Sequence, residues 1–118
     1  MKTKKILYWT ATVLLAAMML VSGIAYLFNT ADVAKEFTAL GFPLYIIVPL
    51  GIAKAIAALV LLNNHYKKLV EWAYAGLFFD FILALSAHLM IGDGEYAPAV
   101  IAILLLSISY RYKDQVRT

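Results

Sequence analysis

The chain has 118 residues, of which 64% are hydrophobic, and a formal net charge of +3. Apolar residues make up roughly half of a soluble domain, so this composition predicts an integral membrane protein, and the length suits one domain over residues 1–118. The basic residues stand at the ends of apolar stretches and form no patch with interleaved aromatic side chains, which argues against nucleic-acid binding.

Four apolar stretches follow one another along the chain, at residues 6–28, 42–62, 69–91 and 96–110. Each is about long enough to cross a bilayer as a helix, although the last has only about 15 apolar residues. Pro49 lies inside the second stretch, where it should free the Tyr45 carbonyl and kink the helix. We therefore expect an all-α fold, a bundle of four transmembrane helices.

Residues 29–41, between the first two stretches, predict a short helix. Asn29 or Thr30 can cap its amino end, and Gly41 can end it. Three apolar residues recur at the spacing of one helical face: Val33, Phe37 and Leu40. This pattern favours an amphipathic helix lying on the membrane surface, with an ordinary structured loop as the alternative.

The distribution of lysine and arginine predicts the orientation of the chain in the membrane. Eight basic residues fall in the amino end, the second loop and the carboxyl end: Lys2, Lys4, Lys5, Lys67, Lys68, Arg111, Lys113 and Arg117. The first and third loops together hold only Lys35. Both termini should therefore lie in the cytoplasm, and we expect the chain in a bacterial inner membrane.

Two charged residues, Lys54 and Asp80, lie in the middle of apolar stretches. A charge at that depth costs about 2.5–3.5 kcal/mol on insertion scales, so it rarely faces lipid unpaired. On a helix, four small residues fall within about 40° of Asp80: Ala73, Gly76, Ala84 and Ala87. Such a stripe lets neighbouring helices approach closely. Lys54 and Asp80 stand at similar depths, so we expect a salt bridge between the second and third spans.

A polar cavity open to the outer leaflet can be built around this pair. We expect Tyr26, Asn29, Lys54, Asp80 and His88 to line it and to bind a ligand. The alternative is that the Lys54–Asp80 pair only fixes helix register, and that His88 only bonds across helices.

Motifs of known chemistries are missing. The chain has no phosphate-binding loop and no zinc-protease or nucleophile-elbow motif, and it has no cysteine, so thiolate chemistry is excluded. His65 and His88 fall near opposite membrane faces, so we predict no metal site. Glu71 is expected to be an interfacial charge near Lys67 or Lys68. No catalytic residue can be named, which favours an accessory subunit over a stand-alone enzyme.

Several short motifs together resemble the DoxX-like family of small four-helix membrane proteins. These are Gly41-Phe42-Pro43, Gly51-Ile52-Ala53-Lys54, Glu71-Trp72-Ala73-Tyr74-Ala75-Gly76, Phe79-Asp80, Ser86-Ala87-His88 and Gly92-Asp93-Gly94. The resemblance implies an association with quinone-coupled sulfur oxidation or with membrane redox complexes that handle thiol stress. Distant relatives in assembly or cargo roles imply a different use of the same fold.

The resemblance and the buried charges together favour a redox-associated membrane subunit that binds a quinone or another small lipophilic ligand between helices. Such a subunit would contact the lipid bilayer, a membrane or periplasmic redox partner, and further copies of itself in a homo-oligomer. The alternatives are a structural or assembly subunit without a ligand, and an oligomeric transporter of a small solute.

Overall fold

The computed structural model describes residues 2–63 and 66–116, so Asn64, His65 and Arg117 lie outside the described residues. The described chain is all-α, as predicted. Its elements are α1 (Lys2–Phe28), α2 (Thr30–Leu40), the short 3₁₀ helix η1 (Leu44–Ile46), α3 (Ile47–Asn63), α4 (Lys67–Ile91) and α5 (Ala97–Val116). The segment expected to form a short helix between the first two spans is α2.

Three helical segments are long and apolar enough to cross a membrane: Lys2–Phe28, Leu44–Asn63 and Lys67–Ile91. The molecule measures 45 Å along its longest axis, close to the thickness of a bilayer with its headgroups. The fourth predicted span falls on α5, a helix of 20 residues that is not among these three segments. A fourth crossing therefore stays a prediction.

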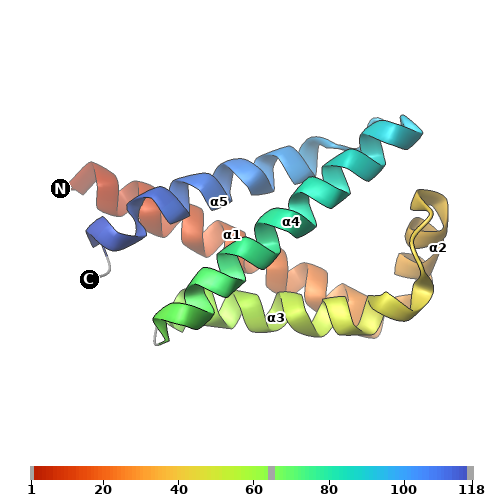
Figure 1. Ribbon diagram of the computed structural model, residues 1–118, viewed down its shortest axis with the longest axis horizontal. Helices are drawn as coiled ribbons and strands as arrows, with labels where there is room; N and C mark the ends of the chain where they lie inside the picture. Colours follow the sequence, from red (N-terminus) through yellow and green to blue (C-terminus); the bar gives the residue numbers. More distant parts are fainter. Residues whose placement is uncertain (1, 64–65, 117–118) are drawn as a thin grey trace.

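Figure 1 shows how the helices are arranged. The start of α1, the end of α5 and the place where α3 gives way to α4 all lie at one end of the molecule. We call this the basic end, because the described lysines and arginines of the two termini and of the second loop lie there. The α1–α2 and α4–α5 connections lie at the opposite end, which we call the acidic end because it carries Asp32, Glu36, Asp93 and Glu95. From the basic end toward the acidic end, α3 and α4 diverge.

The prediction that Pro49 lies in the interior of the helix is wrong. The α-helix begins at Ile47, after the 3₁₀ turn, so Pro49 lies in the first turn of α3. Pro49 has no N–H to donate to the Tyr45 carbonyl, and a proline is tolerated in a first turn, where the N–H groups have no partner within the helix. The chain thus avoids the conflict by starting its α-helix later. Gly41 does end α2, in the left-handed conformation with φ of 82°.

α1 and α3 approach each other closely at two glycines. A Cβ added to Gly23 would lie 2.8 Å from the Gly51 carbonyl oxygen, and one added to Gly51 would lie 2.8 Å from the Tyr26 Cβ. Gly76, which was expected to allow close packing around Asp80, has no atom within 4 Å of such a Cβ. Small side chains permit close approach but do not force it, and here they line an opening between α3 and α4.

The main core lies where α1, α3, α4 and α5 meet. Its largest buried apolar side chains are Leu15, Leu61, Tyr74, Leu77, Phe81 and Leu106. A smaller cluster formed by Val33, Phe37 and Ile47 attaches α2 to α3. The main core holds α3 and α4, which carry the charged pair described next, against α1 and α5.

Candidate functional site

Lys54 and Asp80 meet between α3 and α4, as the sequence predicts. The Lys54 Nζ lies 3.9 Å from the Asp80 Oδ2, and both side chains are shielded, with 10% and 25% of their surface exposed. Lys54 is one turn beyond the Gly23–Gly51 contact on α3, and Asp80 is near the middle of α4. At 3.9 Å the two groups form an ion pair but no direct hydrogen bond.

Lys54 has further partners on α1. Its ammonium donates a hydrogen bond to the Ser22 Oγ at 3.0 Å and lies 4.1 Å from the centroid of the Tyr26 ring. A cation over the face of an aromatic ring is attracted by the ring quadrupole. The lysine is therefore held by a hydroxyl, a ring and a carboxylate from two neighbouring helices.

Asp80 is less well satisfied than Lys54. Within residues 2–63 and 66–116, the structure gives its carboxylate one charged neighbour, Lys54, and no hydrogen-bond donor. A carboxylate removed from bulk water normally accepts several hydrogen bonds, and leaving them unmade is costly. The partly exposed oxygens of Asp80 can therefore accept a hydrogen bond from a molecule that enters the space beside them.

That space is a cavity of about 520 Å³. Besides Lys54 and Asp80, residues of α1, α2, α4 and the start of α5 with the turn before it line this cavity. They are Met18, Met19, Ser22, Glu36, Phe81, Ala84, His88, Glu95, Pro98 and Ala99. Of the five residues predicted to bind a ligand, Lys54, Asp80 and His88 line it together. Tyr26 lines a smaller cavity of about 70 Å³ that also borders Lys54 and Asp80.

Asn29 lines neither of these two cavities. It lies exposed at the junction of α1 and α2 as the N-cap of α2, without a side-chain capping bond. Its backbone carbonyl accepts hydrogen bonds from the Asp32 and Val33 N–H groups.

His88 has a specific partner at the acidic end. Its Nδ1 lies 2.7 Å from the Asp93 Oδ2, and the other oxygen of Asp93 accepts a hydrogen bond from the Glu95 N–H at 2.9 Å. These donors, the Glu95 N–H first and His88 second, hold the pKa of Asp93 below its ordinary value. The histidine thus stands between the cavity and the α4–α5 turn, with its orientation fixed by a carboxylate.

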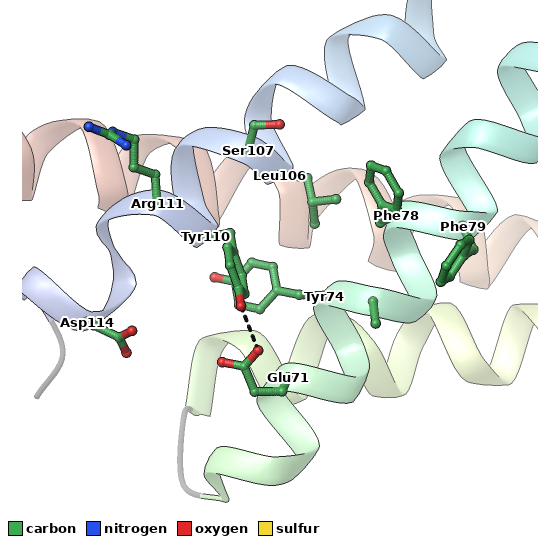
Figure 2. Close-up of a pocket in the computed structure, with 10 residues that line it drawn as sticks. Glu71, Tyr74, Phe78, Phe79, Leu106, Ser107, Tyr110, Arg111 and Asp114 are labelled. Carbon is green, nitrogen blue, oxygen red and sulfur yellow. Dashed lines mark hydrogen bonds between the residues drawn. The ribbon is translucent and has the colours of Figure 1, made fainter.

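A second and larger cavity, of about 690 Å³, lies between α4 and α5 toward the basic end. Figure 2 shows its side chains: Glu71 and Tyr110 point toward one another, and Phe78, Phe79 and Leu106 form the apolar part. The Tyr110 hydroxyl donates to Glu71 at 2.9 Å. Sequence reasoning did not find this cavity.

Glu71 and Tyr110, the facing polar groups of the second cavity, already have partners. Lys113 lies 2.7 Å from Glu71 and 3.1 Å from Asp114, so Glu71, which was expected as an interfacial charge, forms an ion pair with α5. Burial lowers the pKa of Lys113, but its bonds to Glu71 and Asp114 outweigh this and hold the pKa above its ordinary value.

A buried hydroxyl cluster lies beside the second cavity. The Ser109 Oγ is 2.6 Å from both the Thr12 Oγ1 and the Tyr74 hydroxyl. The three side chains come from α5, α1 and α4, and all are buried. Because these groups satisfy one another, they leave little for a ligand to gain, in contrast to Asp80.

The Lys54–Asp80 cavity is therefore the better candidate site, although it is the smaller of the two. Asp80 and Lys54 border this open space, and among the described residues no hydrogen-bond donor reaches the Asp80 carboxylate. No group of three or more metal-ligating side chains comes together within the described residues, so the chemistry on offer is hydrogen bonding and charge.

Three comparisons with known proteins were informative to different degrees. No curated protein and no solved structure matches the chain. A family model matches residues 10–109, which include every helix from most of α1 to the middle of α5 and all residues of the ion-pair cavity. The chain is an integral membrane protein that belongs to the DoxX-like family.

Proposed function

We propose that the chain is a subunit of a membrane redox complex and that it binds a quinone, or a similar small lipophilic molecule, at the Lys54–Asp80 pair. The observation that carries this proposal is the Asp80 carboxylate, which borders a cavity of about 520 Å³ without a hydrogen-bond donor. A ligand that donates to Asp80 would make a charge-assisted bond, one of the stronger kinds in proteins.

The donor set fits both forms of a quinone. The Lys54 ammonium can donate to a carbonyl oxygen, and Asp80 can accept from a hydroxyl. The pair therefore offers one group for the oxidised form and one for the reduced form, 3.9 Å apart. When bound, a quinone supplies coupled electron and proton transfer, while the chain's own residues orient its polar head. Because the chain has no cysteine, thiol chemistry would belong to a partner.

The proposal includes an orientation in a bacterial inner membrane, with both termini in the cytoplasm and α5 as a fourth crossing. The basic and acidic ends of the molecule support it, since positively charged loops face the cytoplasm. The ligand cavity, bordered by Glu36 and Glu95, would then open toward the periplasmic side. A membrane or periplasmic redox partner, or a second copy of the chain, would dock there.

Quinone binding by the purified protein in lipid nanodiscs tests the proposal. We expect saturable binding by the wild-type chain and about tenfold to hundredfold weaker binding by Asp80→Asn, because a hydrogen bond to a charged group is lost. Asp32→Asn, a change of the same kind on the exposed face of α2, should bind like the wild type.

The single Asp80 variant leaves Lys54 without its counter-ion, so it can fail to fold. The double variant Lys54→Met, Asp80→Asn removes both charges and keeps the side-chain volumes. We expect it to fold and to bind quinone weakly. A double variant that binds as tightly as the wild type, or a wild-type protein that shows no saturable binding, would overturn the proposal.

A structural subunit without a ligand is the second candidate. One observation favours it: Lys54 contacts Ser22, Tyr26 and Asp80 and so connects α1, α3 and α4. If each single variant abolishes expression, the double variant restores it, and no form binds quinone, this second function is the correct one.

A further inference from the structure

An apolar groove runs along α3 and α4 from the Lys54–Asp80 pair toward the basic end. It encloses about 450 Å³ and has no charged residue in its lining apart from Lys54 and Asp80. Small residues on both helices, Ala57 on α3 and Ala73 and Gly76 on α4, form part of its wall. Since no atom lies within 4 Å of a Cβ built at Gly76, the space over this residue is open.

The groove faces outward, where the lipid of a bilayer would lie. Trp72, in the wall at its far end, is 74% exposed, and Ile56 in the wall formed by α3 is 54% exposed. From Asp80 to Leu69, the lining residue farthest along α4, the groove extends for about 16 Å at the helical rise of 1.5 Å per residue. It is therefore a long, narrow and apolar space with a polar head end.

We propose that this groove takes the hydrocarbon tail of the molecule whose polar head binds at Lys54 and Asp80, which makes the ligand a long-chain amphiphile. This inference rests on the proposed function. The groove and the polar cavity share Lys54 and Asp80 in their linings. A head group at the ion pair therefore has a polar space on one side and an apolar space on the other.

A helix of a second copy is a poor occupant by size. A helical segment about 16 Å long and about 10 Å across fills roughly 1,200 Å³, more than twice the 450 Å³ of the groove. A single hydrocarbon chain is much thinner, and it can follow the groove without separating α3 from α4. The volume therefore favours a tail over a helix.

Two probes with the same head separate tail binding from head binding: a benzoquinone with a decyl chain and the same quinone without a chain. We expect Gly76→Leu to weaken binding of the decyl compound about tenfold or more, since extra methylenes in an apolar pocket exclude ligand atoms. Binding of the chainless compound should change less than about twofold. Ala75→Leu, a similar enlargement at the next position on α4 but outside this groove, should leave both compounds unaffected.

A second measurement does not depend on the folding of a variant. A decyl quinone with a diazirine at the end of its chain, photoactivated on the wild-type protein in nanodiscs, should label the peptide that contains Leu69 and Trp72. Labelling of the residues beside the polar cavity instead, such as Met18 or Pro98, would overturn the inference. So would a Gly76→Leu variant that binds both quinones like the wild type, or one that changes the oligomeric state and not the binding.

The failure of this inference can be told apart from the failure of the proposed function. If Asp80→Asn still weakens both quinones while Gly76→Leu weakens neither, the head site stands and the tail groove is wrong. If the Lys54 and Asp80 variants bind both compounds as the wild type does, the proposed function is wrong, and the groove inference falls with it.

Discussion

Replacing Gly23 by alanine tests the contact that sets the distance between α1 and α3. The new Cβ would lie 2.8 Å from the Gly51 carbonyl oxygen and 3.2 Å from the Ala55 nitrogen, both of them backbone atoms. Neither atom can rotate away. To reach an ordinary separation of about 3.4 Å, the two helices must move apart by about 0.6 Å.

That movement has two expected effects. Overpacking of this kind costs about 1–3 kcal/mol, while the better helix propensity of alanine returns about 0.5–1 kcal/mol, so the free energy of unfolding should fall by up to about 2.5 kcal/mol. Ser22 is the next residue on α1, and a shift of this size would stretch its 3.0 Å bond to Lys54 toward about 3.6 Å, beyond hydrogen-bond range.

Unfolding of the purified protein in mixed micelles, followed by circular dichroism, measures the first effect. Gly76→Ala is the matched control, because no atom lies within 4 Å of a Cβ at that position, and its stability should be unchanged or slightly higher. If Gly23→Ala is as stable as Gly76→Ala, the close contact between the helices does not limit their packing and the reasoning is refuted.

Two further predictions concern the hydroxyl cluster and the α4–α5 turn. Ser109→Ala should lower the free energy of unfolding by about 1–3 kcal/mol, since two buried hydroxyls lose their partner. The control is Ser107→Ala at an exposed position, which loses only a bond to a backbone carbonyl and should change the free energy of unfolding by less than about 0.5 kcal/mol. Equal losses in the two variants would contradict a stabilising role for the hydroxyl cluster. The pKa of Asp93 lies below its ordinary value. The ionised Asp93 therefore stabilises the turn fully at a pH above the pKa that Asp93 has in the unfolded chain. This stabilisation is lost as the pH falls through the lowered pKa of the folded state. A carboxyl NMR titration of Asp93 with a midpoint at or above about 3.9 would show that the hydrogen bonds to the turn do not form.

The sequence was sufficient to find the ion pair, for a physical reason. A charge inside an apolar run is so costly that a partner at the same depth is required, and Lys54 and Asp80 are the charged residues near the middle of their spans. The helix-ending role of Gly41 was equally readable, because only glycine adopts a left-handed backbone without strain.

Other features had no signal of this kind. Thr12, Tyr74 and Ser109 come from three distant segments, and a hydroxyl in a helix carries no strong penalty that demands a partner. Nothing in the sequence indicated that Glu71 pairs with Lys113, because these residues meet only through the packing of α5 on α4. The small residues near Asp80 were read as a contact, while the real contact at Gly23 depends on the approach of two backbones.

The hydroxyl cluster joins α1, α4 and α5 without any formal charge. Neither ionic strength nor the transmembrane voltage changes the strength of these neutral hydrogen bonds much, because both act on charged groups. The basic end should therefore stay assembled when salt or the energised state of the membrane changes. Responses to those variables should then come from the ionised groups: the Glu71–Lys113 pair, the exposed acids beside the polar cavity, and the Lys54–Asp80 pair.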